Sequence, residues 1–247
     1  MLMLSAPAFS ISEDISSIII LGVTPEVVQL PWPSNACLHA YDHSADMIAS
    51  VWRPHFRNPS FVHQVRWQSM PLSEESVDLV IGDGCFSVLP CADEYRAVFD
   101  EAARVLKPFG RVVLRCFIRP ELSESLEDIV TAVYNGQIGS FHALKWRVAM
   151  AIKPEHEFNI AVSDIYAAFN NYFPDRKQLA EFTGWPSEAI DTIEAYKVND
   201  VRYTFPTMSE LKLLLLPFFN IVDIRHGSYE LADRCPILSL QPKQRTL

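Results

Sequence analysis

A glycine and an aspartate near the start of the chain have the spacing of a nucleoside-binding pair. Gly22 follows the apolar run Ile18–Leu21, and Asp42 stands 20 residues later, at the end of a second apolar run. A glycine after a buried strand lets the backbone turn sharply and approach a ligand. An acidic side chain about 20 residues further on is placed to accept hydrogen bonds from ribose hydroxyls. The alternatives are a plain strand-to-helix turn at Gly22 and a helix cap at Asp42.

The residues after Gly22 predict a helix start that needs no further glycine. Thr24 suits the N-cap position and Pro25 the first helical position, so backbone amides can still face a carboxylate or phosphate. Glu26 favours the helix but opposes an anion beside it. A nicotinamide dinucleotide needs the pattern G-x-G-x-x-G, whereas Thr24 and Val27 occupy the later glycine positions here. A dinucleotide site is therefore disfavoured.

The elements that must position these residues alternate between strand and helix patterns. The clearest helix is 92–106, where apolar side chains recur at helical spacing until Lys107-Pro108-Phe109-Gly110 ends it. The strand candidates are mostly continuous apolar runs, which are typical of a parallel sheet covered on both faces. They are 17–22, 36–41, 61–67, 77–82, 111–118, 219–225 and 236–241. This alternation predicts a doubly wound α/β fold with a mostly parallel, seven-stranded, Rossmann-like sheet.

Residues 121–205 interrupt that pattern with helix-like segments and no convincing strand. The helices are expected over 121–134, 140–153, 162–172 and, in two pieces split near Gly184-Trp185-Pro186, over 175–196. About 85 residues are too many for a connecting loop. The sequence therefore predicts a core formed by 1–120 and 206–247, and a helical lid formed by 121–205. The lid leaves the sheet after its fifth strand, at the carboxyl edge where open α/β sheets bind ligands.

Composition excludes several classes of partner. The net charge is −9 and no Lys/Arg cluster is present, so the average surface repels nucleic acid. Residues 1–12 lack the basic start and long apolar core of a signal peptide. The most apolar stretch, 211–222, is too short to cross a membrane. Four of the five cysteines lie in or beside apolar runs, which predicts buried, reduced thiols and a cytoplasmic protein. No His/Cys spacing predicts a metal site, and the oligomeric state is not readable.

Two stretches carry a resemblance to a known family. "MPLSEESVDLVIGDGCFSVLP" and "EYRAVFDEAARVLKPFGRVVLR" resemble the middle of class I S-adenosylmethionine-dependent methyltransferases. The family's Leu-Pro-Phe turn falls at Met70-Pro71-Leu72, its Ser-Phe-Asp-Leu-Val at 76–80, its Leu-Pro at 89–90, and its Arg-Val-Leu-Lys-Pro-Gly-Gly-Arg hairpin at 104–111. The similarity runs over about 17–118 and resumes at 207–241. It implies S-adenosylmethionine as the cofactor.

The resemblance also assigns residues to the cofactor. It places Gly22, Val23 and Thr24 beside the methionine moiety, and Asp42 on the ribose. The remaining positions are His43 and Met47 near the adenine, Arg66 and Trp67 at the adenine edge, and Asp83 and Gly84 beneath the sulfonium.

The sequence departs from the family pattern at several of these positions. Ile20 stands where the family usually has an acid, and Thr24 and Glu26 replace two glycines. Arg66 stands where an aspartate often contacts the adenine, and Phe109 replaces one glycine of the hairpin. These departures bear on how tightly the cofactor binds.

Methyl transfer requires alignment and exclusion of water, and a base only where the acceptor carries a proton. Asp83 is the main catalytic candidate, because the tip of its strand would let it orient an acceptor or offset the sulfonium charge; the alternative is a cap on the turn through Gly84. In the lid, His142 and Trp146 share a helix face at i, i+4, which suggests a base beside a binding platform; the commoner alternative for such a pair is surface-to-core packing. Tyr166 and Tyr203 are further candidates for lining a substrate pocket, although core packing is the commoner role of such residues.

Three functions remain to be separated. The leading hypothesis is a methyltransferase acting on a small molecule, since an acidic surface and a large lid favour an enclosed acceptor. The sequence "GDGCF" follows the fourth strand instead of Asn-Pro-Pro-Tyr or Asp-Pro-Pro-Tyr, which argues against methylation of base amines. The alternative is a non-catalytic binding or interaction protein with the same fold. An oxidoreductase is weakened by the missing glycine pattern.

Overall fold

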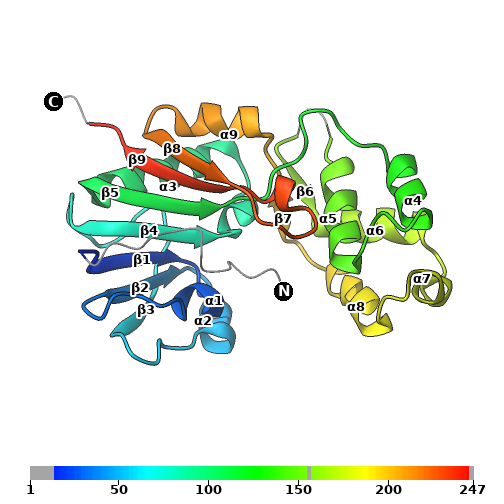
Figure 1. The fold of residues 1–247 in the computed structure, drawn as a ribbon, viewed down its shortest axis with the longest axis horizontal. Helices are drawn as coiled ribbons and strands as arrows, with labels where there is room; N and C mark the ends of the chain where they lie inside the picture. Colours follow the sequence, from blue (N-terminus) through cyan, green and yellow to red (C-terminus); the bar gives the residue numbers. More distant parts are fainter. Residues whose placement is uncertain (1–13, 155–156, 245–247) are drawn as a thin grey trace.

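Seven strands form one sheet in the described part of this computed structural model, residues 14–154 and 157–244 (Figure 1). Their order across the sheet is β3-β2-β1-β4-β5-β9-β8. The strands are β1 (Ser17–Leu21), β2 (Cys37–Asp42), β3 (Ser60–Gln64), β4 (Val77–Asp83), β5 (Leu106–Arg115), β8 (Phe219–Arg225) and β9 (Ile237–Pro242). β1 to β5 pair in parallel, whereas β9 is antiparallel to both of its neighbours. The predicted mostly parallel, doubly wound sheet is confirmed; residues 1–12, where no signal peptide is predicted, lie outside the described residues.

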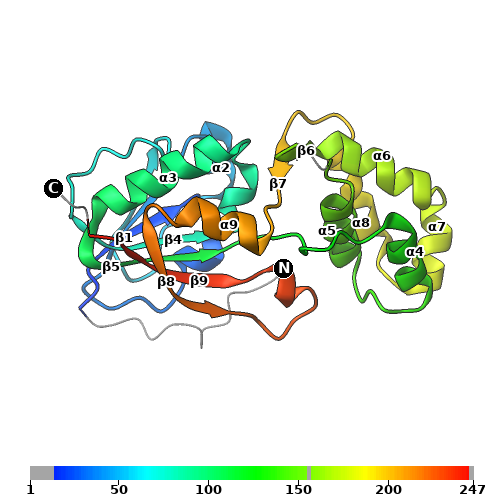
Figure 2. The same cartoon turned by 90° about the horizontal axis from the view of Figure 1, so that it is seen from above.

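The central strand β1 buries side chains on both faces of the sheet. Ile18 and Ile20 pack on the face of α1 (Pro25–Val28) and α2 (Ala45–Val51). Ile19 and Leu21 point to the opposite face, which carries α3 (Ala92–Val105) and α9 (Met208–Leu215). Figure 2 shows α3 and α9 side by side over that face. Covering both faces explains why the strands are continuous apolar runs instead of alternating ones.

The inserted helices form a second body beside the carboxyl edge of the sheet (Figure 1). They are α4 (Leu126–Tyr134), α5 (Phe141–Ala151), α6 (Val162–Tyr172), α7 (Arg176–Thr183), α8 (Ser187–Asp191) and the 3-10 helix η2 (Thr192–Tyr196). The predicted split near 184–186 is confirmed, because Gly184 ends α7 with a φ of +73° and Pro186 precedes α8. Phe141, Phe169 and Phe205 are at most 1% exposed in this body, so the lid has an apolar core of its own.

Some predicted boundaries are wrong. Residues 121–205 contain two strands, β6 (Asn159–Ala161) and β7 (Arg202–Thr204), which pair antiparallel. Three residues each are too few to show a periodicity of two. Lys107-Pro108-Phe109-Gly110 ends α3 as predicted, but these residues continue as the start of β5 instead of forming a turn. β3 ends at Gln64, three residues before its predicted end at 67.

The loop between β3 and β4 is held by a buried carboxylate. Glu101 on α3 accepts the backbone N–H of Met70 at 2.6 Å and pairs with Arg104 at 2.7 Å. Arg104 in turn donates to the carbonyl oxygens of Met70 and Leu72. This network fixes the Met70-Pro71-Leu72 turn, and thereby the loop that carries Trp67 to the edge of the sheet.

The cysteines are all free, and their burial differs from the prediction. Cys116 and Cys235 are buried, Cys37 and Cys85 are half-buried, and Cys91 is exposed. The prediction of buried thiols, made from the neighbouring apolar runs, is therefore confirmed for two of the cysteines only. Among the described residues, no helix combines the length and the apolar character that a membrane crossing requires.

Candidate active site

Gly22 makes a turn that a residue with a side chain would adopt only under strain. Its φ is +93°, in the region that favours glycine. Its N–H donates to the Tyr41 carbonyl oxygen at 2.8 Å, which ties the turn to the end of β2. A Cβ on Gly22 would lie 4.0 Å from both Asp42 Oδ2 and the Trp67 ring. A Cβ would therefore contact both side chains, and its absence leaves the backbone of the turn open toward Asp42 and Trp67.

The helix after this turn is only one turn long. Thr24 occupies the N-cap position and Pro25 the first helical position, as predicted, but the Thr24 side chain makes no capping hydrogen bond. Val23 is 3% exposed and packs with the α1 face of the core, so only its backbone can face a ligand. Ile20, at the position where the family usually has an acid, is fully buried on the same face.

Asp42 ends β2 with a carboxylate that is only partly used. The residue is 8% exposed, and its Oδ1 accepts the Ser44 N–H at 2.8 Å. Ser44, and not Asp42, caps α2, because its hydroxyl accepts the Met47 N–H. Oδ2 faces the space beside Gly22. The position suits a bond to ribose hydroxyls, and the helix-cap alternative belongs to Ser44.

The residues assigned to the adenine differ in exposure. His43 and Met47 are exposed on the α2 side, and Arg66 is exposed after β3. Trp67 is 7% exposed, and its Nε1 donates to the Tyr41 carbonyl oxygen at 2.5 Å. Because Gly22 donates to the same oxygen, Trp67 is locked against the glycine turn and forms one wall of this space.

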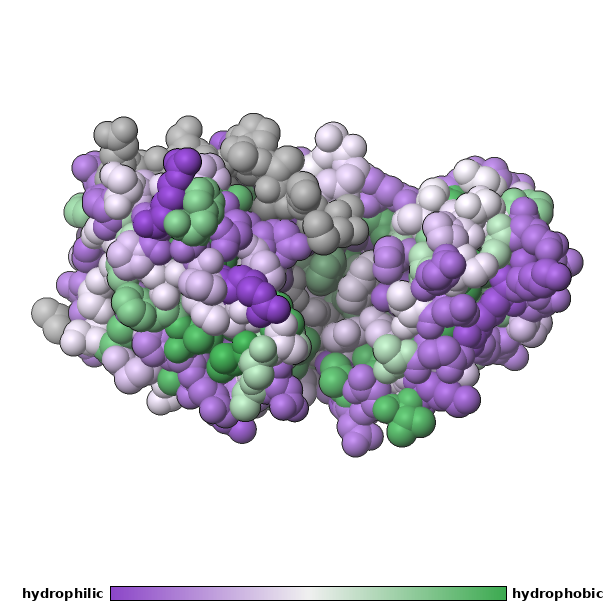
Figure 3. Space-filling model, turned by 90° about the horizontal axis from the view of Figure 1, so that it is seen from below, coloured by the Kyte–Doolittle hydropathy of each residue, from purple (hydrophilic) through white to green (hydrophobic). Residues whose placement is uncertain are grey.

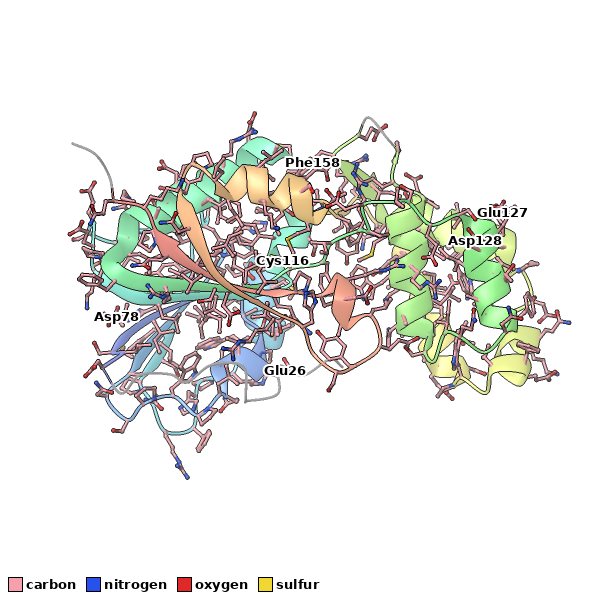
Figure 4. All side chains as sticks on the ribbon, turned by 45° about the horizontal axis from the view of Figure 1, so that its top comes forward. Glu26, Asp78, Cys116, Glu127, Asp128 and Phe158 are labelled. Atoms are coloured by element: carbon pink, nitrogen blue, oxygen red, sulfur yellow. The ribbon has the colours of Figure 1, made fainter. Side chains whose placement is uncertain are left out.

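Asp83 forms a buried ion pair that the sequence analysis did not foresee. It pairs with Arg115 at the end of β5, and the side chains are 5% and 8% exposed respectively. Burial raises the pKa of Asp83 above its usual value, and nearby Glu26 adds to this, while Arg115 acts against the rise. Figure 4 shows Glu26 and Cys116 near the edge of the sheet that faces the lid. The signal for Arg115 was a cation in the middle of the apolar run 111–118, flanked on both sides by apolar residues, which requires a buried partner.

The tip after Asp83 turns at a second positive φ. Gly84 has a φ of +64°, and a Cβ there would lie 2.5 Å from the Phe117 ring. Arg115 lies over the same ring, 5.8 Å from its centroid. The Phe117 ring therefore packs directly on the strand tip that the resemblance places beneath the sulfonium.

A cavity of about 190 Å³ opens beyond Phe117, between the lid and the residues that lead into β9. His142 and Trp146, both predicted from the sequence, line it from α5 together with Met150. Figure 3 shows the surface hollowed between the core and the lid. Tyr203 packs on Trp146 from behind, with ring centroids 5.6 Å apart, and the hydroxyl of Tyr166 donates to Glu194 on the lid. The structure thus brings His142 and Trp146 together in one cavity, with Tyr203 behind them and Tyr166 elsewhere.

Residues near the C-terminal end complete this cavity and were not predicted. Glu230, Arg234 and Cys235 line it from the core side. Burial raises the pKa of the Cys235 thiol to about 11, so the thiol stays neutral. Glu230 contacts Gly139 and Ser140 across about 90 residues of sequence, a long-range pairing that leaves no local pattern.

Comparison with known proteins matches this geometry to one family. Residues 24–114 match the model of the family described as Methyltransferase domain. The match covers 91 of the 247 residues, from the turn after β1 to the end of β5. A search of curated protein sequences gives no match.

Solved structures share the fold over nearly the whole chain. An S-adenosylmethionine-dependent methyltransferase from Methanosarcina mazei aligns with a TM-score of 0.54 and 14% identity, covering 94% of this chain and 93% of that one. A Rhodobacter sphaeroides protein provisionally named a Zn-dependent alcohol dehydrogenase gives 0.56 and 8%, covering 93% and 85%. A Listeria monocytogenes protein provisionally named an S-adenosylmethionine-dependent methyltransferase gives 0.50 and 10%, covering 95% and 94%. At these identities the likeness shows the class I, Rossmann-like methyltransferase fold.

The cofactor of this fold is S-adenosylmethionine, and the residues present fit its nucleoside. Gly22 leaves the space that a Cβ would fill, Asp42 directs a carboxylate oxygen toward it, and Trp67 closes one side. Asp42 and Asp83 end β2 and β4, which both pair with β1 at the carboxyl edge. Among the described residues no cluster of His, Cys, Asp or Glu is arranged to hold a metal ion.

Proposed function

We propose that the chain transfers a methyl group from S-adenosylmethionine to a small-molecule acceptor. The observation that carries the proposal is the arrangement of Gly22, Asp42 and Trp67 around one space at the carboxyl edge, while Phe117, which packs on the strand tip at Gly84, lines the lid cavity. A nucleoside site and a separate acceptor cavity on the same edge are what methyl transfer between two molecules requires.

The chain's residues have distinct roles in this proposal. When bound, S-adenosylmethionine supplies an electrophilic methyl group. Asp42 holds the ribose, the backbone of Val23 and Thr24 faces the amino-acid end, and His43, Met47 and Arg66 flank the adenine. The Asp83–Arg115 pair closes the base of the site and keeps the local charge near zero. The lid covers the site and excludes water.

Two contacts hold the lid to the core. Glu124 pairs with Arg147 on α5 and with Arg234, the latter at 2.9 Å. Thr204 on β7 shares a hydrogen bond of 2.7 Å with the hydroxyl of Tyr95 on α3. These contacts favour an enclosed, low-mass acceptor over a polymer. Separately, the free cysteines support our placing the protein in the cytoplasm.

A second candidate function is a non-catalytic binding protein with the same fold. One observation favours it: Asp83 is already neutralised by Arg115, so its carboxylate carries no free charge to meet the sulfonium at that strand tip. Methyl transfer does not require one, because the reaction needs alignment more than a charged group. Binding of the cofactor separates the two functions.

Thermal unfolding of the full chain with added ligands tests the proposal. The purified protein is first shown by mass spectrometry to carry no co-purified nucleoside. S-adenosylhomocysteine should then raise the midpoint progressively with concentration, since a ligand at 100 times its Kd adds about 2.7 kcal/mol of stability. No shift with S-adenosylhomocysteine would support the non-catalytic protein, and a shift with NADH alone would indicate an oxidoreductase.

A further inference from the structure

The lid cavity has the size and lining of a site for a single ring. Its volume is about 190 Å³, and an engineered cavity of about 150 Å³ with an apolar lining holds benzene. The Phe117 and Trp146 rings stack on one another with centroids 4.8 Å apart and planes 19° apart. Phe205 meets the Trp146 ring edge-on at 5.6 Å. Trp146 is therefore fixed in place as a flat wall, against which an aromatic ring can stack.

The polar groups of the cavity set the charge of what it can hold. Glu230 accepts the Gly139 N–H at 2.6 Å and the Ser140 hydroxyl at 3.0 Å, and within the described part of the chain no cation pairs with it. Both donors are uncharged, so the carboxylate keeps its negative charge beside the cavity. Glu124 pairs with both Arg147 and Arg234, the latter at 2.9 Å, so the two arginines are balanced by the two carboxylates of Glu124 and Glu230. An uncharged ligand therefore suits this lining better than a charged one.

His142 is the group that can take a proton in this cavity. It lines the cavity one helical turn before Trp146 on α5 and is exposed, which places it at the rim. Burial and the neighbouring Lys145 hold the pKa of His142 below its usual value. The imidazole is then neutral at pH 7 and can accept a hydrogen bond from an O–H group.

We propose that the cavity between α5 and residues 230–235 binds an uncharged, single-ring phenol as the methyl acceptor, with the ring stacked on Trp146 and the hydroxyl facing His142. This rests on the proposed function. The phenol oxygen forms a bond to the methyl carbon while the bond from that carbon to the cofactor's sulfur breaks. The sulfur keeps the electron pair and leaves as a thioether, and the phenolic proton passes to the imidazole of His142.

Binding of three matched probes to the full chain tests the ring and the charge. The probes are 4-methylphenol, its saturated analogue 4-methylcyclohexanol, and 4-hydroxybenzoate, titrated by ligand-observed NMR. We expect 4-methylphenol to bind at least about tenfold more tightly than either of the others, a difference of about 1.4 kcal/mol. Equal binding of 4-methylphenol and 4-methylcyclohexanol would overturn the proposal.

Variants assign the binding to this cavity. Trp146→Ala should weaken the binding of 4-methylphenol at least about tenfold. Phe182 is an exposed aromatic on α7, and Phe182→Leu should leave this binding unchanged. Glu230→Gln keeps an acceptor for Gly139 and should allow 4-hydroxybenzoate to bind nearly as well as 4-methylphenol. If Trp146→Ala does not fold, Glu230→Gln decides alone: unchanged rejection of 4-hydroxybenzoate would overturn the role of this cavity.

The proton transfer has its own readout. With S-adenosylmethionine present, His142→Gln should lower the rate of 4-methylphenol methylation while leaving its Kd within about twofold. The lost rate should return as the pH approaches the phenol's own pKa near 10, because the acceptor then no longer needs a base. A variant with an unchanged rate and pH profile would remove His142 from the reaction.

The two proposals fail in distinguishable ways. If S-adenosylhomocysteine raises the thermal midpoint but no phenol binds, the acceptor class is wrong and the methyltransferase proposal stands. If 4-methylphenol binds as described but S-adenosylhomocysteine does not, the cavity is a phenol site in a protein that does not transfer methyl groups, and the proposed function fails.

Discussion

Two aspartates end strands on either side of β1, and they have opposite surroundings. Asp42 is 8% exposed and bonds to one backbone N–H, that of Ser44. Asp83 is equally withdrawn from solvent but pairs with the guanidinium of Arg115. The Ser44 N–H and the exposed His43, 3.8 Å away, leave the Asp42 charge available to a ligand, whereas the buried Arg115 cancels that of Asp83. A position at a strand tip is therefore not enough to make an acidic side chain available to a ligand. Whether its charge is available depends on the nearest cation.

The largest effect should come from breaking the Asp83–Arg115 pair. Arg115→Met leaves a buried carboxylate without its cation, and we expect a loss of about 3–5 kcal/mol in the free energy of unfolding. Arg111→Met, on the same strand but bonded only to carbonyl oxygens of Phe109 and Gly110, should cost less than about 0.5 kcal/mol. Urea unfolding of both variants measures the difference, and similar losses would show that the pair has no special role.

The glycine turn should respond to substitution in stability and in ligand binding together. Gly22→Ala forces alanine into a φ of +93°, which should cost about 1–2 kcal/mol, and its methyl group would enter the space beside Asp42. Gly136→Ala, at a φ of +67° in the lid with open space around it, provides the same strain away from the site. Both variants should lose stability, but only Gly22→Ala should weaken the binding of S-adenosylhomocysteine. Equal affinity of the two variants for S-adenosylhomocysteine would place the ligand elsewhere.

The smallest effect is expected at a third aspartate, Asp78, which lies on β4 at the opposite end of the strand from Asp83 (Figure 4). Burial alone would raise the pKa of Asp78, but Lys107 at 2.6 Å and the N–H groups of Ser16 and Ser17 hold it below its usual value. A lowered pKa means that this group stabilises the fold above about pH 4, and that its contribution is lost as the pH falls through the folded-state value.

Because Lys107 is partly exposed, the contribution of its pair with Asp78 should stay below about 1 kcal/mol. Lys107→Met should therefore reduce stability at pH 7 and leave it nearly unchanged at pH 2. Urea unfolding at the two pH values measures this, and a loss of the same size at both would mean that packing, and not charge, explains it.

The sequence predicted the sheet well because its strands are buried on both faces. Continuous apolar runs such as Ile18–Leu21 leave few alternatives to a covered parallel sheet. It failed where an element was too short to show a pattern, as in β6 and β7, or where tertiary pairing overrode a turn signal, as at Lys107-Pro108-Phe109-Gly110. There β5 starts directly after α3 and pairs with β4.

The residues of the site show the same difference between local patterns, which the sequence reveals, and long-range pairings, which it does not. Gly22, Asp42 and Trp67 belong to local segments with recognisable spacing, and they meet in the structure. Arg115 and Glu230 act through partners 32 and 91 residues away, Asp83 and Gly139. No local pattern encodes such pairs, although an arginine flanked by apolar residues, such as Arg115, indicates that a buried partner must exist.

The most direct measurement is a calorimetric titration of S-adenosylhomocysteine into ligand-free wild type, Asp42→Asn and Asp46→Asn. Asp42→Asn keeps the bond to Ser44 but removes the charge, and Asp46 is an exposed acid on the first turn of α2. If Asp42 holds the ribose, the wild type should bind in the micromolar range. Asp42→Asn should bind about tenfold more weakly, a loss of about 1.4 kcal/mol, and Asp46→Asn should match the wild type. Absence of binding in the wild type, or equal affinity in Asp42→Asn, would contradict a cofactor site at this edge of the sheet.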